Sequence, residues 1–509
     1  MRAAISLVLC LASGILLALA FPRAGLWPLA WVALVPWLVV VLTASWPVVV
    51  AGSWLAGFAF FAFLMYWVAI FGYLPWALVA LIEGFAFVLT AVVSRIVAPH
   101  SGLGVLAVGV AWVTWEFARG LGEFGVTWGQ LGHSQAQFLP LAQLAAFGGV
   151  PAISFIVIIT NAALAHAIVE RSRGWRACRP VIYAAVLVIA AVSLGAAHIR
   201  LVEGAIAADR RPPVRTVRVG IAQASLKSWL TVEQLNVPLT LEQQSSELSA
   251  YAMLTRQAAA RGAQVVIWPE SAVPGYLEYE SAVRQGVTSL ARELGIWMLV
   301  GGPAYDNGRE FNSAYAITPQ GEVTGRYDKV HLVPFGEYVP WRKWLPLLRN
   351  YRVRETDVSR GTEHRLLRLD GLAVGPMICF ESVFPYISRR EADRGAQALV
   401  IITNDAWFLR TAAAAQHLQI GRFRAIEQGL YVARAAATGT SCFFDPLGRV
   451  TASLPLMKRG VIVADIRPRA ADTLYRRIGP AFPAVCVVGL FCWLLAALLL
   501  RRRRERPKS

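Results

Sequence analysis

Long apolar runs constrain the fold of this chain more than any other feature. A helix needs roughly 17 to 25 mostly apolar residues to cross about 30 Å of hydrocarbon, and about eight stretches of the sequence fit that pattern. They are residues 5–21, 27–43, 48–71, 76–93, 103–117, 148–168, 181–198 and 481–500. The second contains Pro28 and Pro36 and the fifth is short, so a buried core helix is the alternative for these two. With 56% hydrophobic and only 16% charged residues, the chain is too apolar for a wholly soluble protein.

The basic residues indicate how the helices are oriented. The net charge is +18, but the arginines cluster beside the apolar runs and are not interleaved with aromatic residues, so the charge does not indicate nucleic-acid binding. The clusters fall at alternate ends of successive helices and comprise Arg2, Arg95, Arg171, Arg173, Arg176, Arg179 and the run 501–504. Positive charge marks the cytoplasmic side of a membrane. We therefore predict that both termini are cytoplasmic and that the segment before the last helix is periplasmic, as in a multi-pass protein of a bacterial inner membrane.

This topology divides the chain into three predicted parts. Residues 1–200 form a seven-helix transmembrane domain, residues 201–478 a periplasmic catalytic domain, and residues 479–509 a last transmembrane helix with a basic cytoplasmic tail. The first apolar run could instead be a cleaved signal peptide, but it lacks a convincing cleavage site of small residues, and its loss would spoil the charge pattern.

Short strands alternate with helices in the exported segment. The patterns predict strands at 217–221, 265–268, 297–301, 311–317, 365–369, 372–378, 398–403 and 441–445, and helices at 241–261, 281–294, 385–394 and 416–428. Such alternation is typical of a layered α/β domain. Catalytic groups in these domains lie at the carboxyl ends of strands.

Two chemically reactive residues follow short apolar strands, namely Glu270 and Cys379, and Lys329 lies between them in the sequence. A thiol has an ordinary pKa of about 8.5 and needs a nearby base or cation to be a good nucleophile at neutral pH. Glu270 can accept the thiol proton, and Lys329 can hold an oxyanion together with the backbone N–H of Phe380. Each residue taken alone has a structural explanation, as a capping, solvated or core residue. The combination favours nucleophilic catalysis.

The remaining cysteines and motifs narrow the chemistry. In the exported segment only Cys379 and Cys442 occur, so a disulfide between them is the alternative to a nucleophilic role. None of the six cysteines has the spacing of a metal site. The segment has no GxGxxG, Walker lysine, HExxH or GxSxG, so the signatures of nucleotide-binding proteins, zinc enzymes and serine hydrolases are missing.

Three motifs carry a resemblance to a known family. They are Trp268-Pro269-Glu270, Tyr327-Asp328-Lys329 with the later Phe335-Gly336-Glu337, and Cys379-Phe380-Glu381-Ser382. In this order they resemble the Glu-Lys-Cys triad of the nitrilase, or carbon-nitrogen hydrolase, superfamily. The motif Thr403-Asn404-Asp405-Ala406-Trp407-Phe408 and the stretch 128–135 extend the resemblance to the bacterial apolipoprotein N-acyltransferases, over nearly all of the chain.

The resemblance implies both a fold and a reaction. The fold would be an αββα sandwich on a membrane domain of about eight helices. The reaction would be a ping-pong transfer. A phospholipid acylates the cysteine, and the resemblance implies phosphatidylethanolamine as this donor. A diacylglyceryl apolipoprotein then takes the acyl group on its N-terminal amine. A thioester conserves the activation of the phospholipid ester, so no ATP, metal or coenzyme A is expected. We further expect a monomer.

The resemblance also implies roles for individual residues. Carried over by motif, the base is Glu270, the oxyanion cation is Lys329, the nucleophile is Cys379, a second essential glutamate is Glu337, the residues after the nucleophile are Phe380 and Glu381, and a substrate-contacting tryptophan is Trp229. The chain departs from the family pattern at Leu409, where glycine is usual, in the alanine-rich stretch 411–415, and at 437–440, where an asparagine-glycine pair is expected.

Two other functions use the same features. A membrane-anchored carbon-nitrogen hydrolase would use the triad to hydrolyse a small amide or nitrile, with water as acceptor. Such an enzyme would need only one membrane anchor, however, and not eight crossings. A membrane scaffold with an inactive nitrilase-like module is disfavoured because Glu270, Lys329 and Cys379 are all present.

Overall fold

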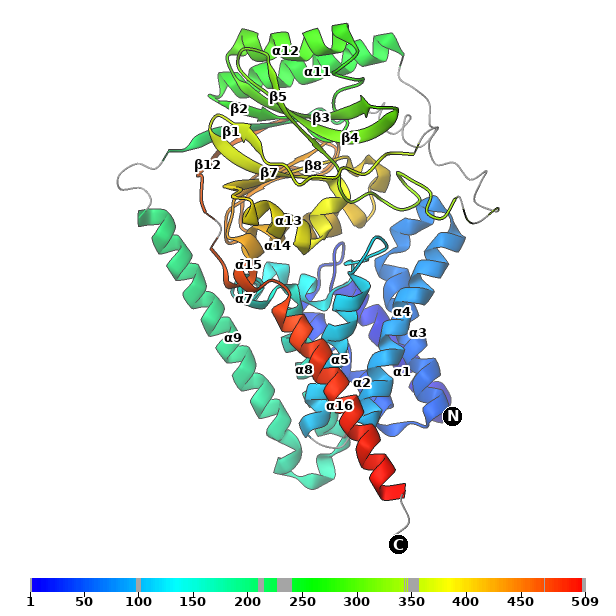
Figure 1. The fold of residues 1–509 in the computed structure, drawn as a ribbon. Helices are drawn as coiled ribbons and strands as arrows, with labels where there is room; N and C mark the ends of the chain where they lie inside the picture. Colours follow the sequence, from blue (N-terminus) through cyan, green and yellow to red (C-terminus); the bar gives the residue numbers. More distant parts are fainter. Residues whose placement is uncertain are drawn as a thin grey trace. The chain divides into compact units, whose positions relative to one another are not determined.

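The computed structural model describes residues 2–97, 102–208, 215–226, 240–342, 344, 346, 357–470 and 472–505, and Figure 1 shows its fold. The chain forms two compact units. The first, the helical unit, consists of Met1–Leu201, Thr411–Gln419 and Arg477–Ser509, and the second, the sandwich unit, of Val202–Arg410 and Ile420–Arg476. The helical unit thus includes a short segment from the middle of the sequence, which the pattern of apolar runs does not predict.

The helical unit is built from the apolar runs. Its helices are α1 (Arg2–Leu19), α2 (Val35–Thr43), α3 (Trp46–Leu64), α4 (Tyr73–Ile96), α5 (Gly102–Arg119), α6 (Leu139–Ala142), α7 (Ala145–Gly148), α8 (Val150–Val169), α9 (Trp175–Ala208) and α16 (Ala481–Glu505). Short 3-10 helices lie between them as η1 (Trp27–Trp31), η2 (Tyr66–Phe71), η3 (Leu131–Gln137) and η4 (Arg171–Arg173).

Five of the described helices are long and apolar enough to cross a membrane, namely α1, α3, α4, α8 and α9. The predicted count of eight is therefore not established. The run 27–43 is broken into η1 and α2, each with a proline in its first turn, because a proline has no N–H to continue a preceding helix. Helix α5 carries Glu116 and Arg119, and the apolar part of α16 is shorter, at Ala481–Ala497.

The helices of this unit pack closely through small residues. A Cβ atom on Gly57 of α3 would lie 2.2 Å from the carbonyl oxygen of Gly84 on α4, so only glycine permits this approach. Buried polar groups join other helices: the Glu116 carboxylate accepts hydrogen bonds from Trp112 Nε1 at 2.7 Å and from the backbone N–H of Leu131 at 2.6 Å. Arg119 pairs with Glu83 at 3.0 Å. These three buried charged groups are therefore partnered, as charged groups away from water must be.

The sandwich unit contains two six-stranded sheets. The first has the order β12-β1-β2-β3-β4-β5, with β12 at Gly460–Ile466, β1 at Val217–Gln223, β2 at Val265–Ile267, β3 at Trp297–Asp306, β4 at Arg309–Ile317 and β5 at Val323–Asp328. The second has the order β11-β10-β9-β8-β7-β6, with β11 at Val450–Leu454, β10 at Ser441–Phe444, β9 at Val432–Ala436, β8 at Ala398–Thr403, β7 at Leu372–Ile378 and β6 at Leu367–Leu369.

Helices cover the outer faces of both sheets. One buried cluster fills the space between the sheets and includes Ile221 and Leu299 from the first and Val400 from the second. A second cluster lies between the first sheet and two helices, α11 (Leu241–Ala260) and α12 (Ser281–Leu294), and Figure 1 shows these helices along one side of that sheet. The outer face of the second sheet is covered by α13 (Pro385–Asp393) and the part of α14 (Ala413–Gln428) that belongs to this unit. The layers are helix, sheet, sheet, helix.

The predicted elements and the observed ones agree in most of this unit, but four strands were not predicted, namely β5, β9, β11 and β12. Strand β9 is buried along its whole length and contains Arg434, so it shows no alternation of polar and apolar residues. Strand β12 pairs with β1 from Val217 opposite Ile466 to Gln223 opposite Gly460. A pairing this distant in sequence leaves no local signal.

Candidate active site

The site forms where strands of both sheets end. Strand β2 is parallel to β1, and β7 is parallel to β8, so their carboxyl ends lie at matching edges. Glu270 follows β2, Cys379 follows β7 and Asn404 follows β8. The backbone N–H of Asn404 donates to Glu270 Oε2 at 2.7 Å. This hydrogen bond joins the strand ends of the two sheets.

Lys329 is the buried cation of the site. It follows β5, its side chain is 1% exposed, and its backbone N–H donates to the carbonyl of Asn312 at 2.9 Å. Its Nζ lies 2.9 Å from Glu337 Oε1 and 3.6 Å from Glu270 Oε1. Burial alone would lower the pKa of Lys329, but the negative charges of Glu337 and Glu270 raise it above its ordinary value. The ammonium is therefore charged at neutral pH.

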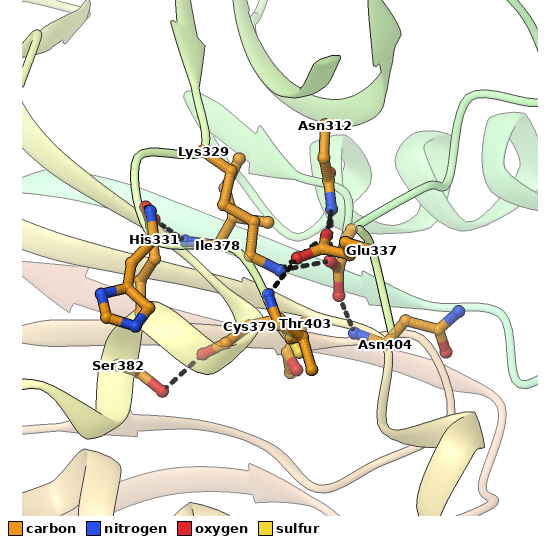
Figure 2. Close-up of polar contacts among 12 residues, drawn as sticks. Asn312, Lys329, His331, Glu337, Ile378, Cys379, Ser382, Thr403 and Asn404 are labelled. Carbon is orange, nitrogen blue, oxygen red and sulfur yellow. Dashed lines mark hydrogen bonds and ion pairs between the residues drawn. The ribbon is translucent and has the colours of Figure 1, made fainter. Parts of the chain in front are cut away.

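Asn312, on β4, connects the two carboxylates that flank this lysine. Its Nδ2 donates to Glu270 Oε1 at 2.7 Å and to Glu337 Oε1 at 3.0 Å. The second oxygen of Glu337 accepts from the backbone N–H of Val333 at 2.8 Å. Burial would raise the pKa of Glu337, but the charge of Lys329 and these hydrogen bonds hold it below its ordinary value. Figure 2 shows the side chains of Asn312, Lys329 and Glu337 converging on one point.

Cys379 sits in a strained turn. It starts a short 3-10 helix, η6 (Cys379–Val383), with a φ of +54°, a region that residues with a side chain rarely adopt. The hydroxyl of Ser382 donates to the carbonyl of Cys379 at 2.8 Å, which secures the turn from within. In Figure 2 the cysteine lies beside Thr403 and opposite the lysine. The turn presents the Cys379 thiol at the end of a buried strand.

The surroundings keep the resting thiol protonated. Burial is the largest cause that raises the pKa of Cys379 well above its ordinary value, and the negative charges of Glu270 and Asp405 add to it. The charge of Lys329 and a hydrogen bond with the Thr403 side chain act in the opposite direction without cancelling the rise. Loss of the thiol proton is therefore favourable only when a nearby group accepts it as a new bond forms.

Glu381 holds the cysteine turn against the lysine segment. Its carboxylate is fully buried and accepts from the backbone N–H groups of Ile378 at 2.7 Å and Val330 at 2.6 Å, and from the hydroxyl of Tyr327 at 2.9 Å. Burial raises the pKa of Glu381 to about 7. Because it bonds residues on either side of Lys329 and just before Cys379, this carboxylate clamps the two segments together.

A buried ion pair supports the far side of the cysteine. Asp405 and Arg434 are both fully buried, with Arg434 Nη2 2.7 Å from Asp405 Oδ2. The other oxygen of Asp405 accepts from the hydroxyl of Thr403 at 3.1 Å. A Cβ atom on Gly439 would lie 2.1 Å from Asp405 Oδ2, so this position in the divergent stretch 437–440 requires glycine. The side chain of Thr403, next to the Cys379 thiol, is thus held in place by its hydrogen bond to Asp405, which is in turn paired with Arg434.

The structure brings together Glu270, Lys329, Glu337 and Cys379, and it places Glu381 directly behind them. Phe380 points to an aromatic cluster and lies 5.0 Å from Phe384 between ring centroids. Trp229 lies outside the described residues. Cys442 is buried on β10, and neither it nor Cys379 forms a disulfide, so the alternative of a disulfide between these two residues is wrong for this structure. Asn312, Thr403 and Asn404 were not singled out from the sequence, although Thr403 and Asn404 lie in a motif that carried the resemblance.

Known proteins are similar to this chain over nearly its whole length. Residues 218–475 match the model of the carbon-nitrogen hydrolase family, and residues 13–163 match that of the apolipoprotein N-acyltransferase N-terminal domain. An apolipoprotein N-acyltransferase from Geobacter metallireducens is 32% identical, over 96% of this chain and 94% of its own length. The chain belongs to the apolipoprotein N-acyltransferase family. Another member, from Azotobacter vinelandii, is 33% identical over 98% of this chain and 96% of its own.

A solved structure of an amidase from Nesterenkonia sp. is also similar to part of the chain. It has 21% sequence identity and a TM-score of 0.39, and the match covers 50% of this chain and 91% of the amidase.

The backbone at Leu409 has an unusual conformation. Leu409, where the sequence resemblance leads us to expect glycine, has φ +49° and ψ −135° after the short 3-10 helix η7 (Asp405–Phe408). This conformation strongly favours glycine. The backbone at this departure from the family pattern therefore keeps a shape for which leucine is poorly suited.

Proposed function

We propose that this protein transfers an acyl chain from a phospholipid, through a thioester on Cys379, to the N-terminal amine of a diacylglyceryl apolipoprotein. This is the last step of lipoprotein maturation. The observation that carries the proposal is the near full-length match to apolipoprotein N-acyltransferases combined with a buried cation, two carboxylates and a cysteine at one point of the sandwich unit.

In the first half-reaction, Cys379 Sγ attacks the carbonyl carbon of the phospholipid ester. Glu270 takes the thiol proton as the new C–S bond forms, and the negative charge that develops on the carbonyl oxygen is stabilised by Lys329 and by the backbone N–H of Phe380. The C–O bond of the ester then breaks. Glu270 returns the proton to the leaving alkoxide, so a lysophospholipid departs and a neutral acyl-cysteine remains.

In the second half-reaction, the α-amine of the apolipoprotein attacks the thioester carbon. Glu270 removes a proton from the attacking nitrogen, the C–S bond breaks, and the proton passes to the thiolate of Cys379. The products are an amide and the free enzyme. A thioester is reactive enough toward an amine that neither half-reaction calls for ATP, a metal or coenzyme A.

Exposed aromatic residues near the site support a lipid substrate. They follow Lys329 in the loop that carries Glu337, and Phe335 is 40%, Trp341 54% and Trp344 84% exposed. Aromatic rings of this kind are enriched where a protein meets the interfacial region of a bilayer. We assign this loop to contact with the donor lipid, for which phosphatidylethanolamine is our proposal, and the same loop shields the acyl-enzyme from water.

We propose the following location for the protein. The five apolar helices and the bacterial relatives support insertion in a membrane. The alternation of basic clusters supports eight crossings of the inner membrane, cytoplasmic termini and a catalytic domain at 201–478 in the periplasm. We also propose that the protein is a monomer. The helices of residues 1–200 and the final helix of 479–509 then form the membrane domain.

The test is to incubate the purified protein with phosphatidylethanolamine and to measure its intact mass. We expect an added acyl chain that hydroxylamine removes, and Cys379→Ala should acquire none. Cys442→Ala is the matched control and should form the adduct at the rate of the parent protein. A protein that forms no adduct, or a Cys379→Ala variant that still forms it, would refute the mechanism. Rapid release of free fatty acid without transfer to a diacylglyceryl peptide would instead identify a hydrolase.

A further inference from the structure

A second candidate ligand site lies in the helical unit, in a cavity of about 770 Å³ lined by residues of α5, α8 and the start of α9. Its walls are mainly apolar and include Leu103 and Leu106 from α5, Ile159 from α8 and Leu187 from α9. This volume falls within the range of about 300 to 1,000 Å³ typical of ligand pockets. None of the residues that we propose for catalysis lines it.

One part of the cavity is strongly basic. Arg173, Arg176 and Arg179 all line it. Arg173 also pairs with Glu170 at 2.7 Å, and the guanidinium of Arg179 lies 4.9 Å from the ring centroid of Trp175. Among the described residues, Arg176 has no acidic partner. Since α9 begins at Trp175, its N-terminal N–H groups and helix dipole add further positive potential at the same place. The basic part therefore favours an anion.

Helix α9 has little protein around it. Of its most apolar 18-residue window only 17% is buried within the structure, compared with 61% for α8. Near its start, Trp175 is 66% and Tyr183 68% exposed, and aromatic residues of this kind mark the level of the lipid headgroups. The cavity thus combines a basic part at headgroup level with an apolar part along a helix that lacks protein neighbours.

We propose that this cavity binds an anionic phospholipid of the bilayer as a fixed structural ligand. Its phosphate lies at Arg176 and Arg179, and its acyl chains lie along Leu106, Ile159 and Leu187. A phospholipid fits better than a soluble anion, because free phosphate has no acyl chain to contact the apolar walls. An anionic lipid fits better than a zwitterionic one because its headgroup adds no cation beside the arginines. The bound lipid joins α9 to α5 and α8.

The test is native mass spectrometry of the full-length protein in detergent, carried as Cys379→Ala so that no lipid is consumed. Phosphatidylglycerol should bind at one saturable site, and phosphatidylethanolamine should not compete for it. The double variant Arg176→Gln/Arg179→Gln should bind phosphatidylglycerol roughly 25-fold more weakly, at about fivefold for each charge removed. Arg2→Gln/Arg171→Gln removes two exposed arginines that do not line the cavity, and it should bind as the parent does.

A thermal melt gives a second measurement. Phosphatidylglycerol should raise the melting temperature of the parent and of the Arg2→Gln/Arg171→Gln variant, but not that of Arg176→Gln/Arg179→Gln, and the increase should shrink at high salt. Equal effects of the two lipids on the parent would overturn the proposal, as would equal effects of phosphatidylglycerol on the two double variants. An equal effect of inorganic phosphate would also overturn it, because the ligand would then not be a lipid.

Discussion

The charge on Lys329 depends mainly on Glu337, which lies 2.9 Å from its ammonium. We predict that Glu337→Gln lowers the rate of acyl-cysteine formation about 100-fold, because a preorganised charge beside the oxyanion is lost or misplaced. The variant should also lower the pKa of Lys329, since Glu337 is the largest cause that raises it. The alkaline limb of the pH–rate profile should then move to lower pH. Single-turnover mass spectrometry across a pH series measures both effects.

Glu363→Gln is the matched control for this substitution. Its side chain is 68% exposed and, within the described part of the chain, forms an ion pair only with Arg365, at 3.2 Å. The rate and the pH–rate profile should therefore stay as in the parent. A Glu337→Gln variant with a slower rate but an unmoved alkaline limb would contradict an electrostatic role for Glu337 toward the lysine.

Glu381 should make stability depend on pH in a definite direction. Its pKa is about 7 in the folded protein, against 4.5 for an ordinary glutamate. Between these values the unfolded chain has already lost the proton that the folded protein keeps, so stability falls as the pH rises. At about 1.4 kcal/mol for each pKa unit, the loss is roughly 3 kcal/mol. Because Glu381→Gln cannot ionise, the stability of the parent relative to this variant should fall by that amount between pH 4.5 and 7.

Denaturant unfolding of both proteins across that pH range measures the difference. A difference that stays constant with pH, or that grows in favour of the parent as the pH rises, would show that Glu381 does not carry a raised pKa in the folded state.

At the level of single residues, the sequence predicts reactive groups better than it predicts the groups that position them. Glu270, Lys329 and Cys379 have side chains whose chemistry is unusual after an apolar strand. Asn312 was missed because an asparagine within a strand has no such signature, and its two hydrogen bonds to carboxylates appear only once β4 is placed. The backbone N–H of Asn404 carries no side-chain signal at all.

Among the elements, the turn after η7 contains avoidable strain. Leu409 has a φ of +49° and a ψ of −135°, and a backbone conformation in such a sparsely populated region costs a residue with a side chain about 1 to 3 kcal/mol. Glycine adopts this conformation without a clash, whereas removal of the partly exposed leucine side chain loses only modest packing. We therefore predict that Leu409→Gly has a net stabilising effect of about 1 kcal/mol on the folded protein. Chemical denaturation of the parent and the variant measures this.

Asn307→Gly is the matched control, because Asn307 has the same φ of +49° and asparagine adopts a positive φ more readily than leucine does. Its stability should change by no more than a few tenths of a kcal/mol. If both variants gain equally, or if Leu409→Gly loses stability, the strain at Leu409 is not the controlling factor.

The elements that the sequence predicts well have local causes. Helix α11 begins at a capping box between Thr240 and Gln243, and α12 has one polar and one apolar face; both follow from neighbouring residues. The break in the run 27–43 also has a local cause in its prolines. By contrast, β9 and β12 are stabilised by strands far along the chain. In their own sequences, polar and apolar residues do not alternate clearly enough to indicate a strand.

For the whole molecule, the proposed topology separates two exposed positions by the membrane. Cys178 is exposed near the start of α9 and should be cytoplasmic, whereas the exposed Glu363 belongs to the sandwich unit and should be periplasmic. In a variant that keeps Cys178 as its only cysteine, a membrane-impermeant maleimide should label nothing until the inner membrane is lysed. The same reagent should label Glu363→Cys, in a background free of other cysteines, as soon as the outer membrane is opened. A mass shift on a gel measures the labelling. The orientation rests on the alternation of basic clusters. Labelling of Cys178 in intact spheroplasts would therefore reverse the assignment of the two sides.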